Sequence, residues 1–387
     1  MFKLYRFKKG VTLWRLLFLV ALSNCSVDFV VAQPQEIDAE VLFSAGESGY
    51  RCFRIPATIT SPTGEILAFA EGRKTSCADF GDVDIVMKRS VDEGLTWSRL
   101  FVVVDNGTDQ AGNSAPVWDV FDSRYPTARL FLFYNTGNAS EWEVREGKGS
   151  RDGWYITSTD QGRSWSDPVN ITSQIHPTTE TSNGVKDFRT LAFTPGHAIQ
   201  LTSERFKGRI VVAANHSHGP PMPDFEDYRS FAIFSDDHGK TWMMSDDVNQ
   251  PASNEAMAAE LEDGQVMMNI RMQDGKVRRR LVCLSDDGGK TWQTPYIDYT
   301  LKNPVCQASI LMLESGELAF VGPNDEIDRK NLSLWKMKDG EWLNPWLIYR
   351  GPSAYSDITE VAPGELLILF EADDYSRILT KRHLIEP

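Results

Sequence analysis

The chain has 387 residues, of which 41% are hydrophobic and 24% are charged, and its formal net charge at pH 7 is -14. This composition supplies a large apolar core and excludes a disordered chain. The negative charge argues against nucleic acid and anionic membrane surfaces as partners. Length leaves the number of domains open, because all-β barrels and propellers of this size often form one unit.

The first 32 residues have the pattern of a secretory signal peptide. Basic residues from Lys3 to Arg15 precede an apolar run, residues 16–22, and the small residue Ala32 suits cleavage. The run is shorter than the roughly 20 residues that cross a bilayer, so no stable membrane span is expected. We expect an exported protein, secreted or periplasmic, with residues 33–387 as a single domain. Lipid attachment at Cys25 is the less favoured alternative.

A charged residue lies inside the first strand-like segment, "YRCFRIPATI" at residues 50–59. Arg54 stands between Phe53 and Ile55, where the remainder of the segment is typical of a strand that enters a core. Removing a guanidinium from water costs several kcal/mol unless it is paired. Arg54 is therefore predicted to meet a carboxylate.

A repeated motif of the form S-x-D-x-G-x-[ST]-W occurs at residues 90–97, 158–165, 235–242 and 285–292. In each copy the aspartate can accept backbone N–H groups across a tight turn, and the glycine supplies a positive φ. The tryptophan offers a large apolar surface that fastens the turn to a sheet. We interpret the motif as a structural turn, not as a set of catalytic acids or a calcium loop.

Short β-type runs alternate with turns along the whole chain, among them "EILAFAEGR", "ARLFLFYNT", "GRIVVAANH", "GQVMMNIRM", "GELAFVGP" and "GELLILFEA". The spacing of the repeats is close to or above the roughly 40–50 residues of a four-stranded propeller blade. The sequence predicts an all-β fold, a propeller of about six blades from roughly residue 40 to the end. The polar stretches at 137–153 and 217–229 are expected to be loops.

The cysteines downstream of the signal segment are expected to pair, because export permits disulfides. The favoured pairs are Cys52 with Cys77 and Cys283 with Cys306. No metal or other cofactor is predicted. His197, His216 and His218 show no third ligand at suitable spacing, and we interpret them as structural or loop residues.

The "FRIP" segment at residues 53–56 and the four repeats together resemble two motifs of the sialidase (exo-α-neuraminidase) family, its arginine signature and its Asp boxes. Asp boxes also occur in unrelated propellers, so the combination carries the specificity. The resemblance extends from about Tyr50 to Tyr375. It implies a six-bladed β-propeller with a site on its axis that releases sialic acids from sialylated glycans.

The resemblance implies that three arginines clamp the carboxylate of sialic acid: Arg54, Arg271 in "MMNIRMQ" and Arg329 in "NDEIDRKNLSL". Glu371 in "LILFEADDY" resembles the carboxylate that braces the first arginine. An acidic protein repels an anionic sugar at long range, so the attraction must be local. Planar guanidinium groups meet a carboxylate bidentately and remain charged, which suits this task.

The resemblance also implies a nucleophile pair, Tyr355 in "SAYSDI" and Glu255 in "SNEAMAAEL", and a general acid/base at Asp79. Asp82 and Asp84 lie in the same acidic stretch and stay open as alternatives to Asp79. A neutral phenol avoids the repulsion that a carboxylate nucleophile meets beside the substrate's own carboxylate. Because the phenol pKa is about 10, it needs a base such as Glu255. The expected outcome is hydrolysis with retention of anomeric configuration.

Other functions would use the same three arginines to bind the carboxylate. One is a trans-sialidase, for which Trp118, Trp142 and Trp154 are candidate acceptor residues, and another is a hydrolase of a related nonulosonic acid. A third is a sialic acid-binding lectin without activity. The "NSAPVWD" segment, residues 113–119, resembles only loosely the segment that holds the N-acyl group in relatives. Linkage preference, N-acyl form and oligomeric state are left open.

Overall fold

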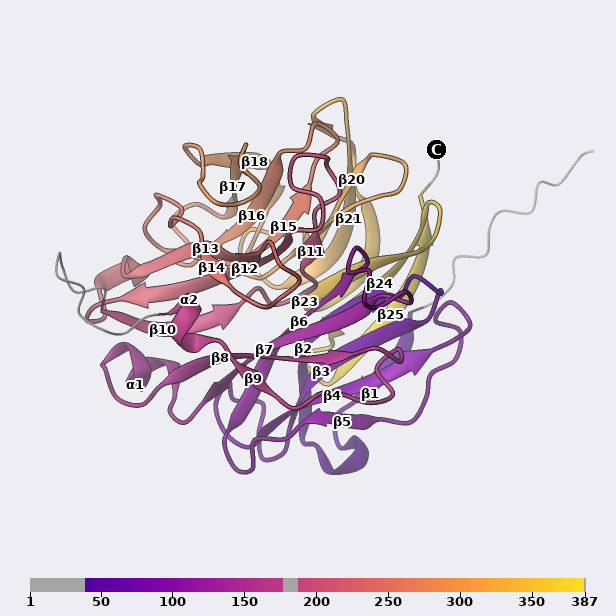
Figure 1. Cartoon of the computed structure of the whole chain (residues 1–387), viewed down its shortest axis with the longest axis horizontal. Coiled ribbons are helices and arrows are strands. Elements are labelled where there is room, and N and C mark those ends of the chain that lie inside the picture. The colour runs from indigo at the N-terminus through magenta and orange to yellow at the C-terminus, as the bar shows by residue number, and fades with distance from the viewer. Residues whose placement is uncertain (1–38, 177–186, 386–387) are drawn as a thin grey trace, which may run out of the picture. The chain divides into compact units, whose positions relative to one another are not determined.

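The computed structural model describes residues 39–176 and 187–385, which form a fold built almost entirely of β-strands (Figure 1). The all-β prediction is therefore confirmed. The predicted signal peptide and Cys25 lie outside the described residues. Within the described ranges, no helix is long and apolar enough to cross a bilayer.

The strands of the first half of the fold fall into three groups, and the strands that pair within a group are antiparallel. A first group contains β2 (Cys52–Thr60), β3 (Ile66–Arg73), β4 (Val83–Ser90) and β5 (Phe101–Val104). The second contains β6 (Gln110–Asp119), β7 (Arg129–Gly137), β8 (Arg151–Ser158) and β9 (Val169–Asn170). The third contains β10 (Phe188–Phe193), β11 (Ile199–Gln200), β12 (Ile210–His218), β13 (Tyr228–Ser235) and β14 (Met243–Met244).

The second half repeats this arrangement. The fourth group contains β15 (Ser253–Glu260), β16 (Val266–Met272), β17 (Arg279–Ser285) and β18 (Tyr296–Lys302). The fifth contains β19 (Ser309–Met312), β20 (Leu318–Pro323), β21 (Lys330–Lys338) and β22 (Glu341–Trp342). The sixth contains β23 (Trp346–Ala362), β24 (Glu365–Ala372), β25 (Arg377–Leu384) and the N-terminal strand β1 (Glu40–Ser44).

Hydrogen bonds link the first group to the second and the fifth to the sixth, so that the strands form four sheets. The first strands of the groups also contact one another in a cycle: β2 with β6, β6 with β10 and β11, β11 with β15, β15 with β19, β19 with β23, and β23 with β2. Side chains between neighbouring groups form the apolar core. The inner strands therefore hold side chains from distant parts of the sequence near one another.

The stretches predicted as loops include short helical segments. Residues 137–153 contain the helix α1 (Glu141–Arg145), which begins at a capping box between Ser140 and Glu143. This pattern, a serine followed three residues later by a glutamate, satisfies two free backbone N–H groups at the helix start. A second helix, α2, spans Thr172–Ile175, and two 3-10 turns span Glu47–Gly49 and Pro223–Phe225.

The repeated motifs form turns that follow β4, β8, β13 and β17, one in each of the first four groups. In the third copy, Asp237 accepts hydrogen bonds from Lys240 N (3.0 Å), Thr241 N (2.9 Å) and Thr241 Oγ1 (2.8 Å). The glycine of every copy has a positive φ, between 71° and 85°. Trp242 is only 4% exposed and packs on Phe133. The structural interpretation of the repeats is confirmed.

Replacing Asp237 with alanine is expected to lower stability more than activity. The substitution removes acceptors for the N–H groups of Lys240 and Thr241, and each lost hydrogen bond costs about 1 kcal/mol. We expect the melting temperature to fall by a few degrees, measured by thermal unfolding, with normal turnover per folded molecule. The exposed Asp167→Ala is the control. An equal loss of stability in both variants would contradict the assigned role.

One of the two expected disulfides is present. Cys52 of β2 is bonded to Cys77, which lies in the segment between β3 and β4. The predicted pair of Cys283 and Cys306 is wrong, because both are free and buried. Cys283 packs into the core between the third and fourth groups, whereas Cys306 packs beside Ile55 and Tyr355, so the two thiols belong to different clusters.

Candidate active site

Arg54 lies where the pairing of β2 with β3 is interrupted by a bulge. The next residue, Ile55, has a φ of 57°, which is unusual for a β-branched residue. Such backbone strain persists only where the surrounding structure holds it. Here the N–H of Ile55 donates to Glu371 Oε1 at 2.9 Å, so the bulge and the carboxylate support each other.

Glu371 of β24 is fully buried and pairs with Arg54. Arg54 Nε donates to Oε1 at 2.5 Å and Nη2 donates to Oε2 at 3.2 Å, and the N–H of Tyr355 donates to Oε2 at 3.1 Å. Burial acts to lower the pKa of Arg54, but the charge of Glu371 outweighs it and raises that pKa. Arg54 is 7% exposed and stays charged beside the carboxylate that the sequence led us to expect.

Tyr355 of β23, Glu255 of β15 and Arg271 of β16 form a triangle of hydrogen bonds. Tyr355 Oη donates to Glu255 Oε1 at 2.5 Å, and Arg271 Nη1 donates to Tyr355 Oη at 2.8 Å and to Glu255 Oε2 at 2.5 Å. Burial and the charge of Glu255 raise the pKa of Tyr355, against the effect of Arg271 and Arg329. The phenol is therefore neutral at rest and is already hydrogen-bonded to a base.

Arg329, which directly precedes β21, completes the set of arginines. Its Nη2 donates to Val305 O at 2.8 Å and its Nη1 donates to Tyr375 Oη at 3.2 Å. The guanidinium carbon lies 5.5 Å from the centre of the Tyr355 ring, and that of Arg54 lies 5.4 Å from it. Two guanidinium groups from distant segments thus surround one phenol.

Asp79 lies next to this arginine set, whereas Asp82 and Asp84 do not. Arg73 Nη1 donates to Asp79 Oδ1 at 2.8 Å, and Arg54 Nη1 is 3.7 Å from the same oxygen. Desolvation acts to raise the pKa of Asp79, but Arg73, Arg54 and Arg329 lower it overall. Asp82 pairs with Lys74, and the buried Asp84 accepts the hydroxyl of Tyr50 at 2.6 Å. The geometry therefore favours Asp79 among the three.

A cavity of about 200 Å³ is lined by six of the seven predicted site residues, which are Arg54, Asp79, Glu255, Arg271, Arg329 and Tyr355. The seventh, Glu371, lines an adjoining cavity of about 480 Å³ together with Arg329 and Tyr375. Residues from β2, β15, β16 and β23 thus meet in one place, and the side chains that face it are strongly polar.

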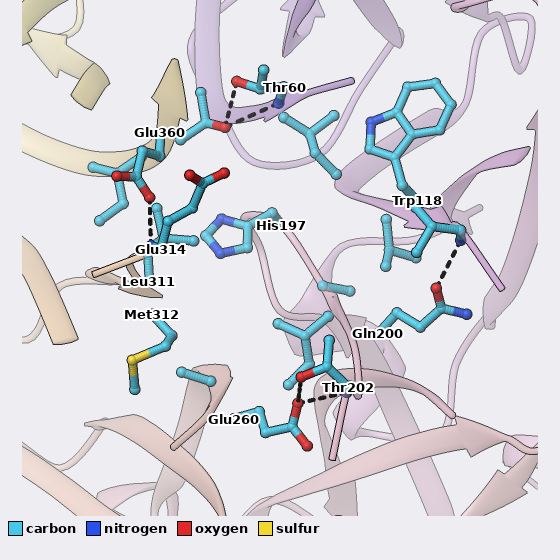
Figure 2. A pocket seen from close by; sticks show the side chains of 18 of the residues that line it. Thr60, Trp118, His197, Gln200, Thr202, Glu260, Leu311, Met312, Glu314 and Glu360 are labelled. Carbon is cyan, nitrogen blue, oxygen red and sulfur yellow. Dashed lines mark hydrogen bonds between the residues drawn. The ribbon is translucent and has the colours of Figure 1, made fainter. Parts of the chain in front are cut away.

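A larger cavity, of about 630 Å³, lies at the other ends of the same inner strands. Figure 2 shows the carboxylates of Glu260, Glu314 and Glu360 around it, with His197 nearby. The described residues that line it include no arginine or lysine. Because an anion is repelled by these carboxylates, this cavity is no site for an acidic sugar.

Comparison with known proteins identifies the family of the chain. A family model described as "BNR repeat-like domain" matches residues 64–368. The chain is 28% identical to "Sialidase" of Micromonospora viridifaciens, with 84% of this chain and 50% of the relative covered. It is 26% identical to "Sialidase-3" of Mus musculus, with 88% and 93% covered. The chain belongs to the sialidase family.

Solved sialidase structures share the fold of this sialidase-family chain. "Hadza microbial sialidase Hz136" superposes with a TM-score of 0.74 at 25% identity, covering 89% of this chain and 68% of the other. A leech intramolecular trans-sialidase superposes with a TM-score of 0.71 at 17% identity, covering 90% and 70%, which shows the fold alone. The chain spans about half the length of the Micromonospora relative and 62% of "Exo-alpha-sialidase" of Arthroderma benhamiae, which is 30% identical over 70% of this chain.

Two charged residues of the site were missed from the sequence, Glu71 and Arg73 of β3. Both are almost fully buried. Arg73 donates to Glu71 Oε2 at 2.7 Å and to Asp79 at 2.8 Å, and Glu71 Oε1 accepts the N–H of Asn113 at 2.9 Å. A sequence signal existed, because the two charges stand two residues apart at the end of an apolar strand and so share one face.

The tryptophans considered as acceptor residues lie in different environments. Trp118 is 6% exposed and lines the cavity of Figure 2, which excludes it from the site described above. Trp154 donates to Thr136 Oγ1 at 2.9 Å and is partly buried. Trp142 is 57% exposed on α1, next to Glu141, which lines the arginine cavity. Of the three, only Trp142 is both exposed and adjacent to that cavity.

The structure agrees with the interpretation of His197 but not with that of His216 and His218. His197 is buried, and its Nδ1 lies 2.8 Å from the buried carboxylate of Asp357, in agreement with a structural role. The interpretation that His216 and His218 lack a third ligand is wrong, because the fold brings Asp247 to them. The spacing in the sequence hid this residue, since 29 positions separate it from His218.

Replacing Glu371 with glutamine is expected to destabilise the fold strongly. The amide leaves the buried charge of Arg54 unpaired, and breaking a buried ion pair costs about 3 kcal/mol or more. The check is the free energy of unfolding by denaturant. Glu360→Gln is a matched control, since its carboxylate accepts the N–H groups of Glu314 and Gly364 instead of a guanidinium. Equal losses in the two variants would remove the special role of the Arg54 pair.

Proposed function

We propose that the chain is an exo-α-sialidase that hydrolyses terminal sialic acids from glycoconjugates on a six-bladed β-propeller. The observation that carries the proposal is the cavity that holds Arg54, Arg271 and Arg329 around the hydrogen-bonded pair of Tyr355 and Glu255. The cycle of contacts among the inner strands supports the propeller, with one blade for each group of strands.

The arginines position the substrate. Sialic acid carries its carboxylate on the carbon that is attacked, so a clamp on this group also fixes the reacting atom. Arg54 keeps Nη1 clear of its two hydrogen bonds to Glu371, and Arg329 faces the same ring of Tyr355. Glu371 holds Arg54 in place from behind, so little rearrangement is needed when the substrate binds.

The first chemical step forms a bond between Tyr355 Oη and the anomeric carbon of the sugar. Glu255 takes the phenol proton through the 2.5 Å hydrogen bond as the bond forms. The glycosidic bond breaks with its electrons, and Asp79 protonates the leaving oxygen. In the second step Asp79 removes a proton from water, which displaces the tyrosine. Glu255 returns the proton to the phenol, and two inversions give net retention.

Binding of an anionic substrate is expected to change the protonation of Asp79. In the free protein Arg73, Arg54 and Arg329 lower its pKa, so the carboxyl group is mostly ionised at neutral pH. A substrate carboxylate neutralises part of this positive charge and raises that pKa. Both kcat and kcat/KM should fall at high pH, where Asp79 loses its proton. Because kcat reports the substrate complex and kcat/KM the free enzyme, the fall in kcat is expected at the higher pH. Profiles of the two parameters on one substrate check this. Coincident limbs would show that substrate binding leaves Asp79 unchanged.

The experiment that tests the function is release of a fluorescent phenol from an aryl α-sialoside by the purified protein. Release, followed by detection of the first-formed α-anomer of sialic acid, would support a retaining sialidase. Added lactose separates hydrolysis from transfer, because a trans-sialidase would form sialyllactose. Binding of sialic acid without turnover would instead indicate a lectin. Neither binding nor turnover would leave a related nonulosonic acid as the substrate to try.

We propose further that the chain is exported through its N-terminal 32 residues. The disulfide between Cys52 and Cys77 supports this, because such bonds persist in oxidising compartments outside the cytosol. N-terminal sequencing of protein recovered from the extracellular or periplasmic fraction tests it. Cleavage after Ala32 is the expected result, whereas a modified Cys25 at the new terminus would indicate a lipid anchor.

A further inference from the structure

A cluster of two histidines and an aspartate lies in the third group of strands, outside the arginine cavity. His216 and His218 belong to β12, and Asp247 lies between β14 and β15. Their Nε2 atoms are 2.8 Å apart, Nε2 of His216 is 2.9 Å from Asp247 Oδ1, and Nε2 of His218 is 3.2 Å from Asp247 Oδ2. Two ring nitrogens and a carboxylate thus converge on one small volume.

Hydrogen bonds alone do not account for these three contacts. An imidazole nitrogen has one in-plane position, which holds either a hydrogen or a lone pair. If both Nε2 atoms carry hydrogens, two N–H groups face each other at 2.8 Å. If one lacks its hydrogen, its lone pair faces a carboxylate oxygen of Asp247, at 2.9 Å for His216 and 3.2 Å for His218, and a carboxylate accepts hydrogen bonds and does not donate them. A cation at the centre of the cluster resolves the conflict, because all the lone pairs then point toward positive charge.

The packing around the cluster holds its ligands in place. The ring of His216 is fully buried and is stacked between Phe188 and Phe231, each with its centroid 4.3 Å away. The backbone on both sides of Asp247 is fixed, since Asp246 N donates to Lys290 O and Val248 N donates to Ser230 O. The side chain of His218 is 37% exposed, which leaves a path for an ion from solvent.

The ligand set indicates the class of metal. Two imidazole nitrogens and a carboxylate suit zinc and similar transition metals, whereas calcium and magnesium prefer oxygen ligands. Around a tetrahedral zinc ion with bonds of about 2.0–2.1 Å, ligand atoms lie roughly 3.3 Å apart. The observed separations of 2.8–3.2 Å between the three ligand atoms need only small side-chain rotations to reach this geometry.

The imidazole of a third histidine lies beside the cluster. His176 follows α2, is 2% exposed, and its ring centre lies 5.9 Å from that of His216. Among the described residues its Nε2 has no hydrogen-bond partner. This ring nitrogen is therefore a further candidate ligand beside the cluster.

In a second cluster of this kind, arginine side chains already neutralise the carboxylates. Asp119, Asp122 and His238 also lie close together. There Arg129 pairs with both carboxylates, at 3.5 and 3.3 Å, and Arg124 pairs with Asp122 at 2.6 Å. The guanidinium groups already supply the positive charge, so this cluster is no cation site and serves as an internal control.

We propose that His216, His218 and Asp247 bind a divalent transition-metal ion of the zinc class. The ion ties the end of β12 to the segment that leads into β15. Those two strands also carry Asn215, Asn254 and Glu255, which line the arginine cavity. The site is therefore a brace for one wall of that cavity, and it takes no part in the chemical steps.

The test measures metal binding by the purified full chain, independently of activity. Protein freed of metal with a chelator is titrated with Zn²⁺, and the metal retained after gel filtration is measured. Co²⁺ provides a second probe, because an ion bound by nitrogen and oxygen ligands at a tetrahedral site absorbs strongly in the visible range. We expect about one equivalent of zinc, a melting temperature raised by about 3 °C or more, and no such effect of Ca²⁺ or Mg²⁺.

Variants assign the bound metal to the cluster. His218→Gln and Asp247→Asn are expected to weaken zinc binding at least about 100-fold, and His238→Ala in the second cluster is expected to bind as the parent does. Asp247→Asn preserves shape, and far-ultraviolet circular dichroism shows whether each variant is folded. Zinc retained equally by the folded His218 and Asp247 variants would overturn the proposal. So would folded parent protein that binds no zinc.

Discussion

Tyr355→Phe is expected to reduce kcat by roughly 10³-fold or more, because the substitution removes the oxygen that we propose forms the covalent bond. Tyr355 is 7% exposed and its ring packs beside Ile55 and Cys306, so phenylalanine fills the same space. Turnover of an aryl α-sialoside measures the loss. Affinity for free sialic acid should change little, since Arg54 and Arg329 remain in place.

Tyr375→Phe is the matched control for this experiment. Tyr375 lies in the same region, with Arg54 stacked 4.1 Å above its ring and Arg329 Nη1 3.2 Å from its hydroxyl. Among the described residues no carboxylate is hydrogen-bonded to its hydroxyl group, in contrast to the pair of Tyr355 and Glu255. Removal of the Tyr375 hydroxyl group is expected to lower kcat/KM by less than about 10-fold. A larger loss for Tyr375→Phe than for Tyr355→Phe would exchange the two roles.

Asp79→Asn is expected to lower the reaction rate by an amount that depends on the leaving group of the substrate. A sugar alkoxide leaves only with a proton, so the rate on a sialylated glycan should fall by about 10²- to 10⁴-fold. An acidic phenol leaves without help, so an aryl sialoside should release a burst of phenol. Slow turnover follows, because the second step has also lost its base. Rapid-mixing kinetics on the two substrates measures both effects.

Asp82→Asn distinguishes the alternatives within the same acidic stretch. Asp82 is paired with Lys74 at 2.8 Å, away from the arginine set, and its substitution should leave the dependence on the leaving group unchanged. Equal loss on both substrates for Asp79→Asn, without a burst, would exclude Asp79 as the acid. If instead the rate of the Asp82→Asn variant depended on the leaving group, Asp82 would be the general acid.

Local motifs made much of the fold and the site predictable from the sequence. The "FRIP" segment combines a bulge, a strained Ile55 and a buried Arg54, all within one strand, so its signature is continuous. The Asp-box turns bond within a few residues, so their pattern is also complete in sequence. The resemblance to sialidases located Tyr355 and Glu255, which the fold then brings into hydrogen-bond contact across 100 positions.

Features that depend on contacts between distant strands were not predictable in the same way. The spacing of Cys283 and Cys306 does not show that one thiol faces the core between neighbouring groups while the other faces the site. Asp247 joins His216 only through the pairing of β12, β13 and β14. Arg73 was overlooked because an arginine at a strand end usually meets solvent, whereas here the segment closed by the disulfide covers it.

The pairing of β1 with β25 has a consequence for how the molecule assembles. Residues 40–44 lie beside residues 377–380, so the sixth group of strands is completed by the two most distant parts of the fold. Closing so long a loop costs entropy before any contact repays it, and such non-local topologies fold slowly. Folding that begins during synthesis leaves β1 without its neighbour until the last strand is made. A truncation that removes β25 therefore exposes an edge at both ends of the chain, and aggregation is its expected outcome.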